Sequence, residues 1–201
     1  MIPIRVDSAW KGISDCRSCG IRDMVLFADL NEQDFGQIHA PIDDLELAAD
    51  AVLFSEGEAA LGVYTLRKGM VKLVRSTADG RARIVRVLRP GDAIGLEALV
   101  TAHHDTEAVA MGAISVCRIP LSVLHHLSAH SPRLHRRLMQ KWQQALKDAD
   151  DWLAELNFGS ARQRVAGLAL KMRDADDPRM TSFFAREDMG AMLDLKLETV
   201  S

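Results

Sequence analysis

Cysteine is scarce in this 201-residue sequence, and long apolar runs are absent from it. Three cysteines are too few for a disulfide scaffold, so Cys16, Cys19 and Cys117 are predicted to be thiols or ligands. No run approaches the roughly 18 apolar residues of a membrane span, and the start MIPIRVDSAWK has no apolar core for a secretory signal. We therefore expect a cytoplasmic protein that has no membrane partner.

An excess of positive charge is also missing. The chain has 25 lysines and arginines against 28 aspartates and glutamates, a formal net charge of −3 at pH 7. No overall field therefore favours nucleic acid, and any contact with DNA must be local. The remaining composition, 48% hydrophobic and 26% charged, is that of a globular protein and leaves room for one large domain or two small ones.

Residues 49–120 consist of short β-rich pieces separated by glycines. The glycines recur at intervals of about a strand plus a turn, where positive φ carries no steric cost. Asp79-Gly80 predicts a hairpin turn, and the segment 89–92 with Pro90 predicts a second turn. This spacing predicts an antiparallel roll or barrel. Its expected strands are AVLF, GVYTL, MVKLV, RIVRVL, AIGLEAL and AISVCRI.

One long helix is predicted after Pro120, where the apolar period changes from two to about three and a half residues. Ser131 is its expected N-cap and Pro132 its first residue, while Gly159 and Ser160 mark its end. A heptad-like seam predicts that two copies pair through this helix. The alternative is a helix laid on its own barrel, and about three heptads do not separate the two. The seam consists of Leu134, Leu138, Trp142, Ala145, Ala149, Trp152 and Leu156.

Shorter helical pieces make up the C-terminal part. A helix over about 160–173 is followed by the turn formers DADDP, which indicate a domain boundary. A helix over 186–193, a break beginning at Asp194 and a second helix from Leu197 then have the spacing of a helix-turn-helix. The chain stops at Ser201, about one turn into the second helix, so the rest of a recognition helix and a winged hairpin are expected beyond it.

Four stretches resemble signatures of the CRP/FNR superfamily of bacterial transcription regulators. They are LFSEGE at 53–58, VYTLRKGMVKL at 63–73, LRPGDAIGLEAL at 88–99 and REDMGAMLDLKLETVS at 186–201. The resemblance implies an α+β fold: an N-terminal antiparallel β-roll of the jelly-roll or double-stranded β-helix type, like a cyclic-nucleotide-binding domain, then a long dimerisation helix and a winged helix-turn-helix. It also implies a homodimer that binds a double-stranded DNA operator and RNA polymerase, and that is no enzyme.

The resemblance divides the chain into a cysteine-bearing segment over 1–25, a β-roll sensor domain over 26–130, a dimerisation helix over 131–158 and a helix-turn-helix domain over 160–201. The last of these would bind DNA. Its expected contact residues are Glu198, which can accept from cytosine, Ser201, which reaches a base or phosphate, and Lys196. Residues 186–201 hold only two basic side chains against four acidic ones, so this chain alone is expected to bind DNA poorly.

Within the superfamily, two stretches are similar to the oxygen-responsive FNR branch: CRSCGIRDMVLFADLNEQD at 16–34 and AISVCRIPL at 113–121. This similarity implies that Cys16, Cys19 and Cys117 hold an iron–sulfur cluster that senses oxygen or redox state. A further cysteine of the branch is replaced here by Val25, which cannot bind iron. The candidates for a fourth ligand are Asp23, His103 and His104.

Several alternatives remain open for the cysteines and histidines. A reversible Cys16–Cys19 disulfide would need a depressed thiol pKa, which Arg17 and Arg22 could supply. Cys117 could be a buried strand residue without chemistry. Haem could bind the histidine pair 103–104, another small ligand could bind the roll, and a CxxC thiol oxidoreductase is the enzymatic alternative.

Cyclic-nucleotide binding is disfavoured by the residues of the roll. The family holds the ribose with a glutamate directly after the second glycine, but Gly95 is followed here by Leu96. The Arg-Ser pair that holds the phosphate is replaced by Thr106-Glu107, which places a carboxylate where an anion should bind. Glu97 could replace the ribose contact, yet nothing replaces the arginine, so cAMP is not expected as a ligand.

Overall fold

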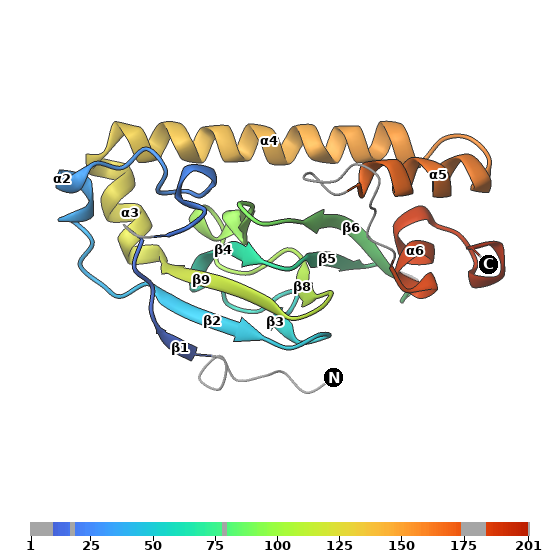
Figure 1. Ribbon diagram of the computed structural model, residues 1–201, viewed down its shortest axis with the longest axis horizontal. Helices are drawn as coiled ribbons and strands as arrows, with labels where there is room; N and C mark the ends of the chain where they lie inside the picture. The colour runs from blue at the N-terminus through green and yellow to red at the C-terminus, as the bar shows by residue number, and fades with distance from the viewer. Residues whose placement is uncertain (1–9, 17–18, 78–79, 174–183, 201) are drawn as a thin grey trace.

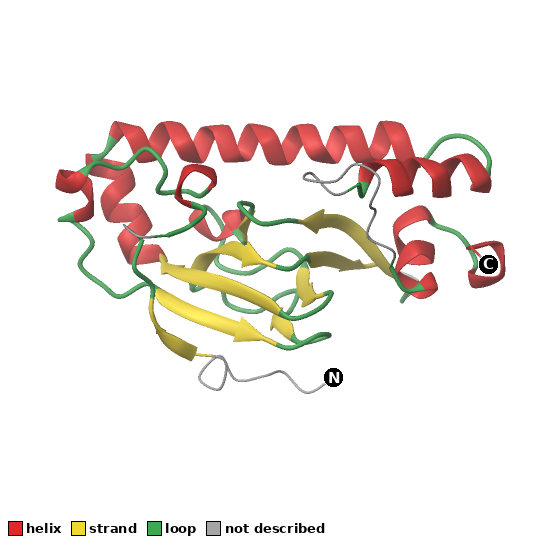
Figure 2. Cartoon of the chain, in the orientation of Figure 1, coloured by secondary structure: helices red, strands yellow, loops and turns green. Residues whose placement is uncertain are grey.

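The chain folds into a β-roll, a long helix that lies along it, and a small helical part at one end (Figure 1). The computed structural model describes residues 10–16, 19–77, 80–173 and 184–200. Figure 2 shows that the strands gather in the roll while the helices lie along it and at its end. This is the predicted α+β architecture. Among the described residues, no helix is both long and apolar enough to span a membrane.

Two antiparallel sheets form the roll. The first has the strand order β1-β2-β9-β4-β7 and the second has the order β3-β8-β5-β6. The strands are β1 Trp10–Ile13, β2 Asp43–Leu47, β3 Val52–Phe54, β4 Gly62–Lys68, β5 Val71–Ser76, β6 Ala82–Leu88, β7 Ala93–Ile94, β8 Glu107–Ala110 and β9 Ile114–Pro120.

Side-chain alternation explains which residues form the core. In β5, Val71 and Leu73 are buried while the residue between them is half-buried, as expected for a strand with one covered face. In β4, the side chains on both faces are buried. Val63 joins an apolar cluster under the helices, whereas Leu66 joins a second cluster between the two sheets. β4 is therefore covered on both faces, which places its side chains next to both clusters.

The predicted strand AIGLEAL is wrong in its second half. Only Ala93–Ile94 is a strand, and Leu96–Leu99 forms the 3-10 helix η2. Gly95 between them has a φ of 77°, and a Cβ at this position would lie 3.1 Å from Cε1 of His104. The glycine therefore turns the chain where the sequence pattern alone continues as a strand.

Other turns and edges follow the prediction more closely. The turn at 89–92 is confirmed, because Asp92 N donates to Arg89 O at 3.0 Å. β5 and β6 pair as an antiparallel hairpin, although Asp79 at its predicted tip lies outside the described residues. No strand was predicted before residue 49. β1 and β2 nevertheless pair with each other, and β2 pairs with β9.

The predicted long helix is confirmed. Ser131 caps it, with its side chain accepting from the backbone N–H of Leu134, and Pro132 is its first residue. A shorter helix precedes it, which the sequence analysis did not separate. The helices are η1 Arg22–Met24, α2 Glu32–Phe35, η2 Leu96–Leu99, α3 Leu121–His130, α4 Pro132–Leu156, α5 Ala161–Lys171, α6 Arg186–Leu193 and α7 Leu197–Val200.

Helix α4 has two apolar faces. One packs inside its own chain, where Leu134 and Leu138 join the cluster under the helices and Leu156 joins a third cluster with α5 and α6. The other face is exposed and carries large apolar side chains. We call these side chains the exposed stripe. They are Met139 at 51% exposure, Trp142 at 37%, Leu146 at 64% and Leu153 at 61%.

The predicted seam is therefore split between the two faces. Leu134, Leu138 and Leu156 are buried in their own chain, so the alternative of a helix laid on its barrel holds for them. Trp142 lies on the exposed stripe, and Met139 and Leu146 were missed. Both faces together form one broad apolar arc, so the spacing of apolar residues could not separate them.

The C-terminal part has the predicted helix, turn and helix. Ser160 and Gln163 form a capping box at the start of α5. α6 ends at Asp194, which has a φ of 55°, and α7 begins at Leu197. Aspartate tolerates this left-handed geometry better than most residues, so the turn forms without glycine. The predicted boundary at DADDP lies outside the described residues.

Asp34 of α2 joins the N-terminal part of the chain to α4. Its Oδ2 accepts from Arg133 Nε at 2.8 Å and from the backbone N–H of Asn31 at 3.1 Å. The hydrogen bond from Arg133 is the main cause that lowers the pKa of this carboxyl. We expect Asp34→Asn to lower the free energy of unfolding at pH 7 by about 1–2 kcal/mol, because a buried charged hydrogen bond is weakened.

The pH dependence has a defined sign. A carboxyl whose folded-state pKa is lowered stabilises the fold above its unfolded value of about 3.9, and that contribution is lost as the pH falls through the folded-state pKa. The difference between the wild type and Asp34→Asn should therefore shrink below about pH 4. Urea unfolding at pH 7 and at pH 3 checks this, with Asp29→Asn at an exposed position as the control. An unchanged difference would contradict it.

Candidate functional site

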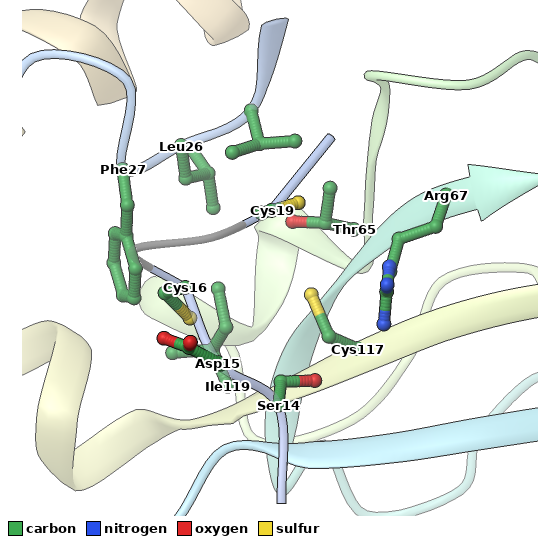
Figure 3. A pocket seen from close by; sticks show the side chains of 11 residues that line it. Ser14, Asp15, Cys16, Cys19, Leu26, Phe27, Thr65, Arg67, Cys117 and Ile119 are labelled. Atoms are coloured by element: carbon green, nitrogen blue, oxygen red, sulfur yellow. The ribbon is translucent and has the colours of Figure 1, made fainter. Parts of the chain in front are cut away.

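The three cysteines line one small cavity between the N-terminal segment and the roll (Figure 3). Cys16 and Cys19 come from the segment after β1, and Cys117 comes from β9. The cavity has a volume of about 20 Å³, which is about the space that one water molecule needs. The other lining residues are Ser14, Asp15, Val25, Leu26, Phe27, Thr65, Arg67 and Ile119.

The roll fixes the position of Cys117. β9 lies between β2 and β4, and Cys117 pairs with Asp44 on one side and with Thr65 on the other. Its side chain is 8% exposed. Thr65 and Arg67 from β4 lie beside it, and Arg67 also donates to Asp44 Oδ2 at 2.6 Å. A buried thiol therefore has a hydroxyl and a paired guanidinium as its neighbours.

Backbone hydrogen bonds position the segment that carries the other two cysteines. Ser14 N donates to Ile42 O at 2.7 Å, which holds the chain against the roll just before Cys16. Arg22 N donates to Cys19 O at 3.0 Å and closes a turn after the second cysteine. The Ser14 hydroxyl is buried, lines the cavity, and has no hydrogen-bond partner among the residues that the structure describes.

The surroundings of Cys16 keep its thiol protonated. Burial, followed by the nearby Cys117 and Cys19 and by Asp15, raises the pKa of Cys16 to about 12. Burial also raises the pKa of Cys117, although the Thr65 hydroxyl and Arg67 partly oppose the rise. The mutual effects of the thiols arise because all three lie close together. Neither Cys16 nor Cys117 is an activated nucleophile in this arrangement.

The size and lining of the cavity decide whether an iron–sulfur cluster fits. Three thiols are suitable soft donors for iron or zinc. However, a space for one water cannot hold a cluster, and no three ligating side chains are gathered closely enough for a metal ion in the described part of the chain. The residues therefore do not fit a cluster in this arrangement. Val25, at the position where the family has a cysteine, lines the cavity with an apolar side chain.

None of the three candidates for a fourth ligand lines this cavity. Asp23 is exposed on η1, and His103 is exposed and bridges to Ala59. His104 is buried beside Gly95, elsewhere in the roll. The carboxylate that does line the cavity is Asp15, which directly precedes Cys16 and which the sequence analysis passed over.

His104 occupies the region where the sequence analysis considered haem and cAMP. Its ring stacks on Phe54 with centroids 3.6 Å apart, and its Nδ1 lies 2.9 Å from Glu97 Oε1. With 3% exposure it is enclosed by its own chain, which leaves little room for an axial haem ligand. Glu97, the proposed substitute for the ribose contact, is engaged by this histidine. Glu107 begins β8, so a carboxylate remains at the position of the expected phosphate.

The expected activation of a Cys16–Cys19 disulfide switch is not present. It required a depressed thiol pKa, whereas the pKa of Cys16 is raised. Arg22 donates to Leu30 O at 3.1 Å, and its guanidinium lies 5.0 Å from the centroid of the Phe35 ring. It is thus engaged away from the cavity. Arg17 lies outside the described residues.

Helix α4 holds the loop that follows the cysteines. Arg137 donates from Nη2 to Asp23 O at 2.9 Å and from Nε to Val25 O at 3.2 Å. Lys141, one turn further along α4, donates to Gly91 O at 2.7 Å. A lining residue of the cavity is thereby joined to the long helix. Arg137, Thr65 and Arg67 were not predicted as site residues. Only Thr65 and Arg67 had a signal in the sequence, because they follow Val63 at intervals of two residues on β4 and so share its face.

The helix-turn-helix leaves its expected contact residues accessible. Lys196 and Glu198 are exposed at the start of α7, and Ser201 lies outside the described residues. The turn before them is well defined, because Asp194 closes α6 and its backbone N–H donates to Gly190 O. The structure therefore presents a short polar surface at the N-terminus of the second helix, where such motifs meet base edges.

Comparison with known proteins gives matches along most of the chain. Residues 44–131 match the family described as cyclic nucleotide-binding domain. The anaerobic regulatory protein of Pasteurella multocida is 28% identical over 195 residues, which cover 92% of this chain and 71% of that protein. The fumarate nitrate reduction regulatory protein of Klebsiella oxytoca is 27% identical over 193 residues, which cover 92% and 77%.

Solved structures agree with this match. FixK2 from Bradyrhizobium japonicum is similar with a TM-score of 0.68 and 29% identity, over 79% of this chain and 80% of that chain. A CRP-family transcriptional regulator from Thermus thermophilus is similar with a TM-score of 0.65 and 25% identity, over 77% and 79%. The similarity to these structures therefore extends over more than three quarters of the chain.

Proposed function

We propose that the chain is a regulator of the CRP/FNR superfamily, that it binds DNA as a homodimer, and that it responds to oxygen or redox state through Cys16, Cys19 and Cys117. The named relatives are regulators, so the chain is a regulator and not an enzyme, and the thiol oxidoreductase alternative is dropped. Two relatives are named for anaerobic regulation and for fumarate and nitrate reduction, which supports an input connected with oxygen.

The gathering of three thiols from two segments around one cavity carries this proposal. Any bond that joins Cys16 or Cys19 to Cys117, whether covalent or through a shared ligand, would tie the N-terminal segment to β9. An iron–sulfur cluster is the cofactor that the family resemblance implies, and it would supply sensitivity to oxygen. Since it does not fit the present cavity, the segment 16–25 would first have to move outward. Haem and cAMP have no support from the contacts of His104 and Glu97.

Movement of that segment would reach the long helix. Val25 lines the cavity and accepts a hydrogen bond from Arg137 of α4, so the two cannot move independently. Two arrangements of the segment would then favour two arrangements of α4, and oxidation would shift the population between them. The residues of this chain thus provide a physical connection from the thiols to the helix.

The dimer is proposed to form through the exposed stripe of α4. Exposed apolar side chains on one face of a helix indicate a partner surface, and their spacing of three, four and seven residues suits a second copy of the same helix. Within this proposal, 1–25 is the cysteine-bearing segment, 26–130 the sensor roll, 131–158 the dimerisation helix and 160–201 the DNA-binding part. The cysteine-bearing segment also contains β1, which pairs with β2 of the roll.

Purification without oxygen tests the sensing proposal. The protein is assayed for iron, acid-labile sulfide and accessible thiols, then exposed to air and assayed again. We expect air to change the iron content or the number of free thiols, and Cys117→Ser to abolish that change. Ser115→Ala, on the same strand, is the matched control and should respond as the wild type does. Three free thiols and no iron before and after air would overturn the proposal.

A further inference from the structure

The helix-turn-helix rests on the roll through charged contacts that the sequence analysis did not anticipate. Lys72 of β5 donates from Nζ to Asp188 Oδ1 of α6 at 2.6 Å. The two side chains are only 16% and 20% exposed, so this pair is partly removed from water. It joins residues 116 positions apart in the sequence. Figure 1 shows α6 beside the ends of β5 and β6.

A second charged contact lies at the turn between the two helices. Arg83 Nη1 of β6 is 2.6 Å from Asp194 Oδ1, and Arg81 Nη1 is 3.5 Å from the same oxygen. Asp194 is the left-handed residue that ends α6 three positions before α7 begins. The roll therefore contacts the helix-turn-helix at the turn between α6 and α7, which sets the direction of α7.

An apolar contact lies between the charged ones. Ile84 of β6 is buried in one cluster with Met192 and Leu193 of α6, and both of these side chains are fully buried. Apolar burial is not directional, so it holds α6 on the sheet without fixing its orientation. The Lys72–Asp188 pair supplies that orientation, because an unpaired, partly buried charge is costly. The Arg83–Asp194 pair contributes less, since Asp194 is 52% exposed.

We propose that the pairs Lys72–Asp188 and Arg83–Asp194 form a charge latch that holds the helix-turn-helix on the sensor roll, and that the latch opens when the DNA-binding part changes its position. This inference goes beyond the redox proposal and does not depend on the cysteines. Both pairs join the roll to the same short segment, so neither contact can shift far without strain at the other. The two pairs therefore form and break together, so that the helix-turn-helix is either docked on the roll or released from it.

A third contact joins the roll to α5. Arg89, in the turn before β7, donates from Nη2 to Lys171 O at 2.8 Å at the end of α5. This bond joins the roll to the backbone of α5, not to α6. α5 also contacts α6, because Arg164 Nη1 donates to Leu193 O at 2.7 Å and Leu168 shares a buried cluster with α6. Opening of the latch would therefore have to break these contacts as well.

Hydrogen exchange measured by mass spectrometry tests the latch on the reduced protein. Lys72→Glu places like charges at 2.6 Å and should speed exchange of the α6 amides at least about fivefold, because local opening sets their rate. Lys72→Glu combined with Asp188→Lys should restore most of the protection. Asp188→Lys alone is also measured, since a positive charge in the first turn of a helix weakens it by itself. Lys68→Glu, an exposed position in the other sheet, is the matched control.

The second pair gives an independent variant. Asp194→Asn keeps a residue that tolerates positive φ while removing the charge, so faster exchange in α6 would follow from the lost pair and not from a strained turn. Exchange in β4 and β9 should stay unchanged in every variant, which excludes global unfolding. Exchange of α6 in Lys72→Glu and Asp194→Asn equal to that in Lys68→Glu would overturn the latch. So would failure of the charge swap to restore protection relative to both single variants.

Discussion

Replacement of Leu146 by glutamate is expected to convert the proposed dimer into a folded monomer. Leu146 is 64% exposed on its own chain and lies in the middle of the exposed stripe, with Trp142 and Leu153 on either side. In a symmetric dimer the change would place two unpaired carboxylates in an apolar contact, which costs several kcal/mol. We expect dimerisation to weaken at least about a hundredfold, which corresponds to about 2.7 kcal/mol. Light scattering should then report the mass of one chain, 22.2 kDa.

Two further variants make this result specific. Gln140→Glu adds the same charge at an exposed position about 100° around the helix from Met139, so it should leave the dimer intact. Leu138→Glu should unfold the chain instead, because Leu138 is 3% exposed in the chain's own core. A Leu146→Glu protein that keeps the mass of two chains would remove the exposed stripe from the interface.

The difference between Leu146 and Leu138 also shows what the sequence could and could not predict about the fold. Ser131, Pro132 and the long apolar period were sufficient to predict where α4 lies, since capping and periodicity are local properties. Which side of α4 meets the roll depends on how the roll is placed beside it. That placement follows from packing between residues far apart in the chain, and no local pattern records it.

The strands, too, were predicted correctly where local signals specify them and wrongly where distant residues do. The glycine-separated pieces predicted the roll because turns and alternation are short-range signals. The pieces that failed depend on distant partners. β1 pairs with β2, and β7 ends before Gly95, against which His104 packs. Neither partner can be identified from the local sequence alone.

The sequence predicted the three thiols of the candidate site but not the residues that surround them. The resemblance placed Cys16, Cys19 and Cys117 together, and the structure gathers them around one cavity. The fourth-ligand candidates Asp23 and His104 were chosen for their chemistry, but Asp23 is exposed on η1 and His104 stacks on Phe54 inside the roll. Burial and the closeness of the thiols set the electrostatics of this site, and both depend on the complete fold.

Those electrostatics predict a large effect on the reactivity of Cys16. A thiol with an ordinary pKa of about 8.5 is about one quarter thiolate at pH 8, whereas a thiol with a pKa of about 12 is thiolate in about one molecule in ten thousand. Only the thiolate reacts with iodoacetamide. We therefore expect native, reduced, metal-free protein to be alkylated at Cys16 about a thousandfold more slowly than the same residue in urea. Mass spectrometry of timed digests measures both rates.

The pH profile and one variant identify the cause. Because the pKa is raised, the rate at native Cys16 should increase about tenfold per pH unit between pH 8 and pH 10, whereas the rate at an exposed thiol should rise only about fourfold over the whole range. Cys117→Ser removes one neighbouring thiol and should speed the reaction at Cys16 only partly, because burial is the larger cause. Native Cys16 reacting within tenfold of its rate in urea would mean that the segment 16–25 is open in solution. In that case the thiols would have the room for a shared ligand that the small cavity denies them.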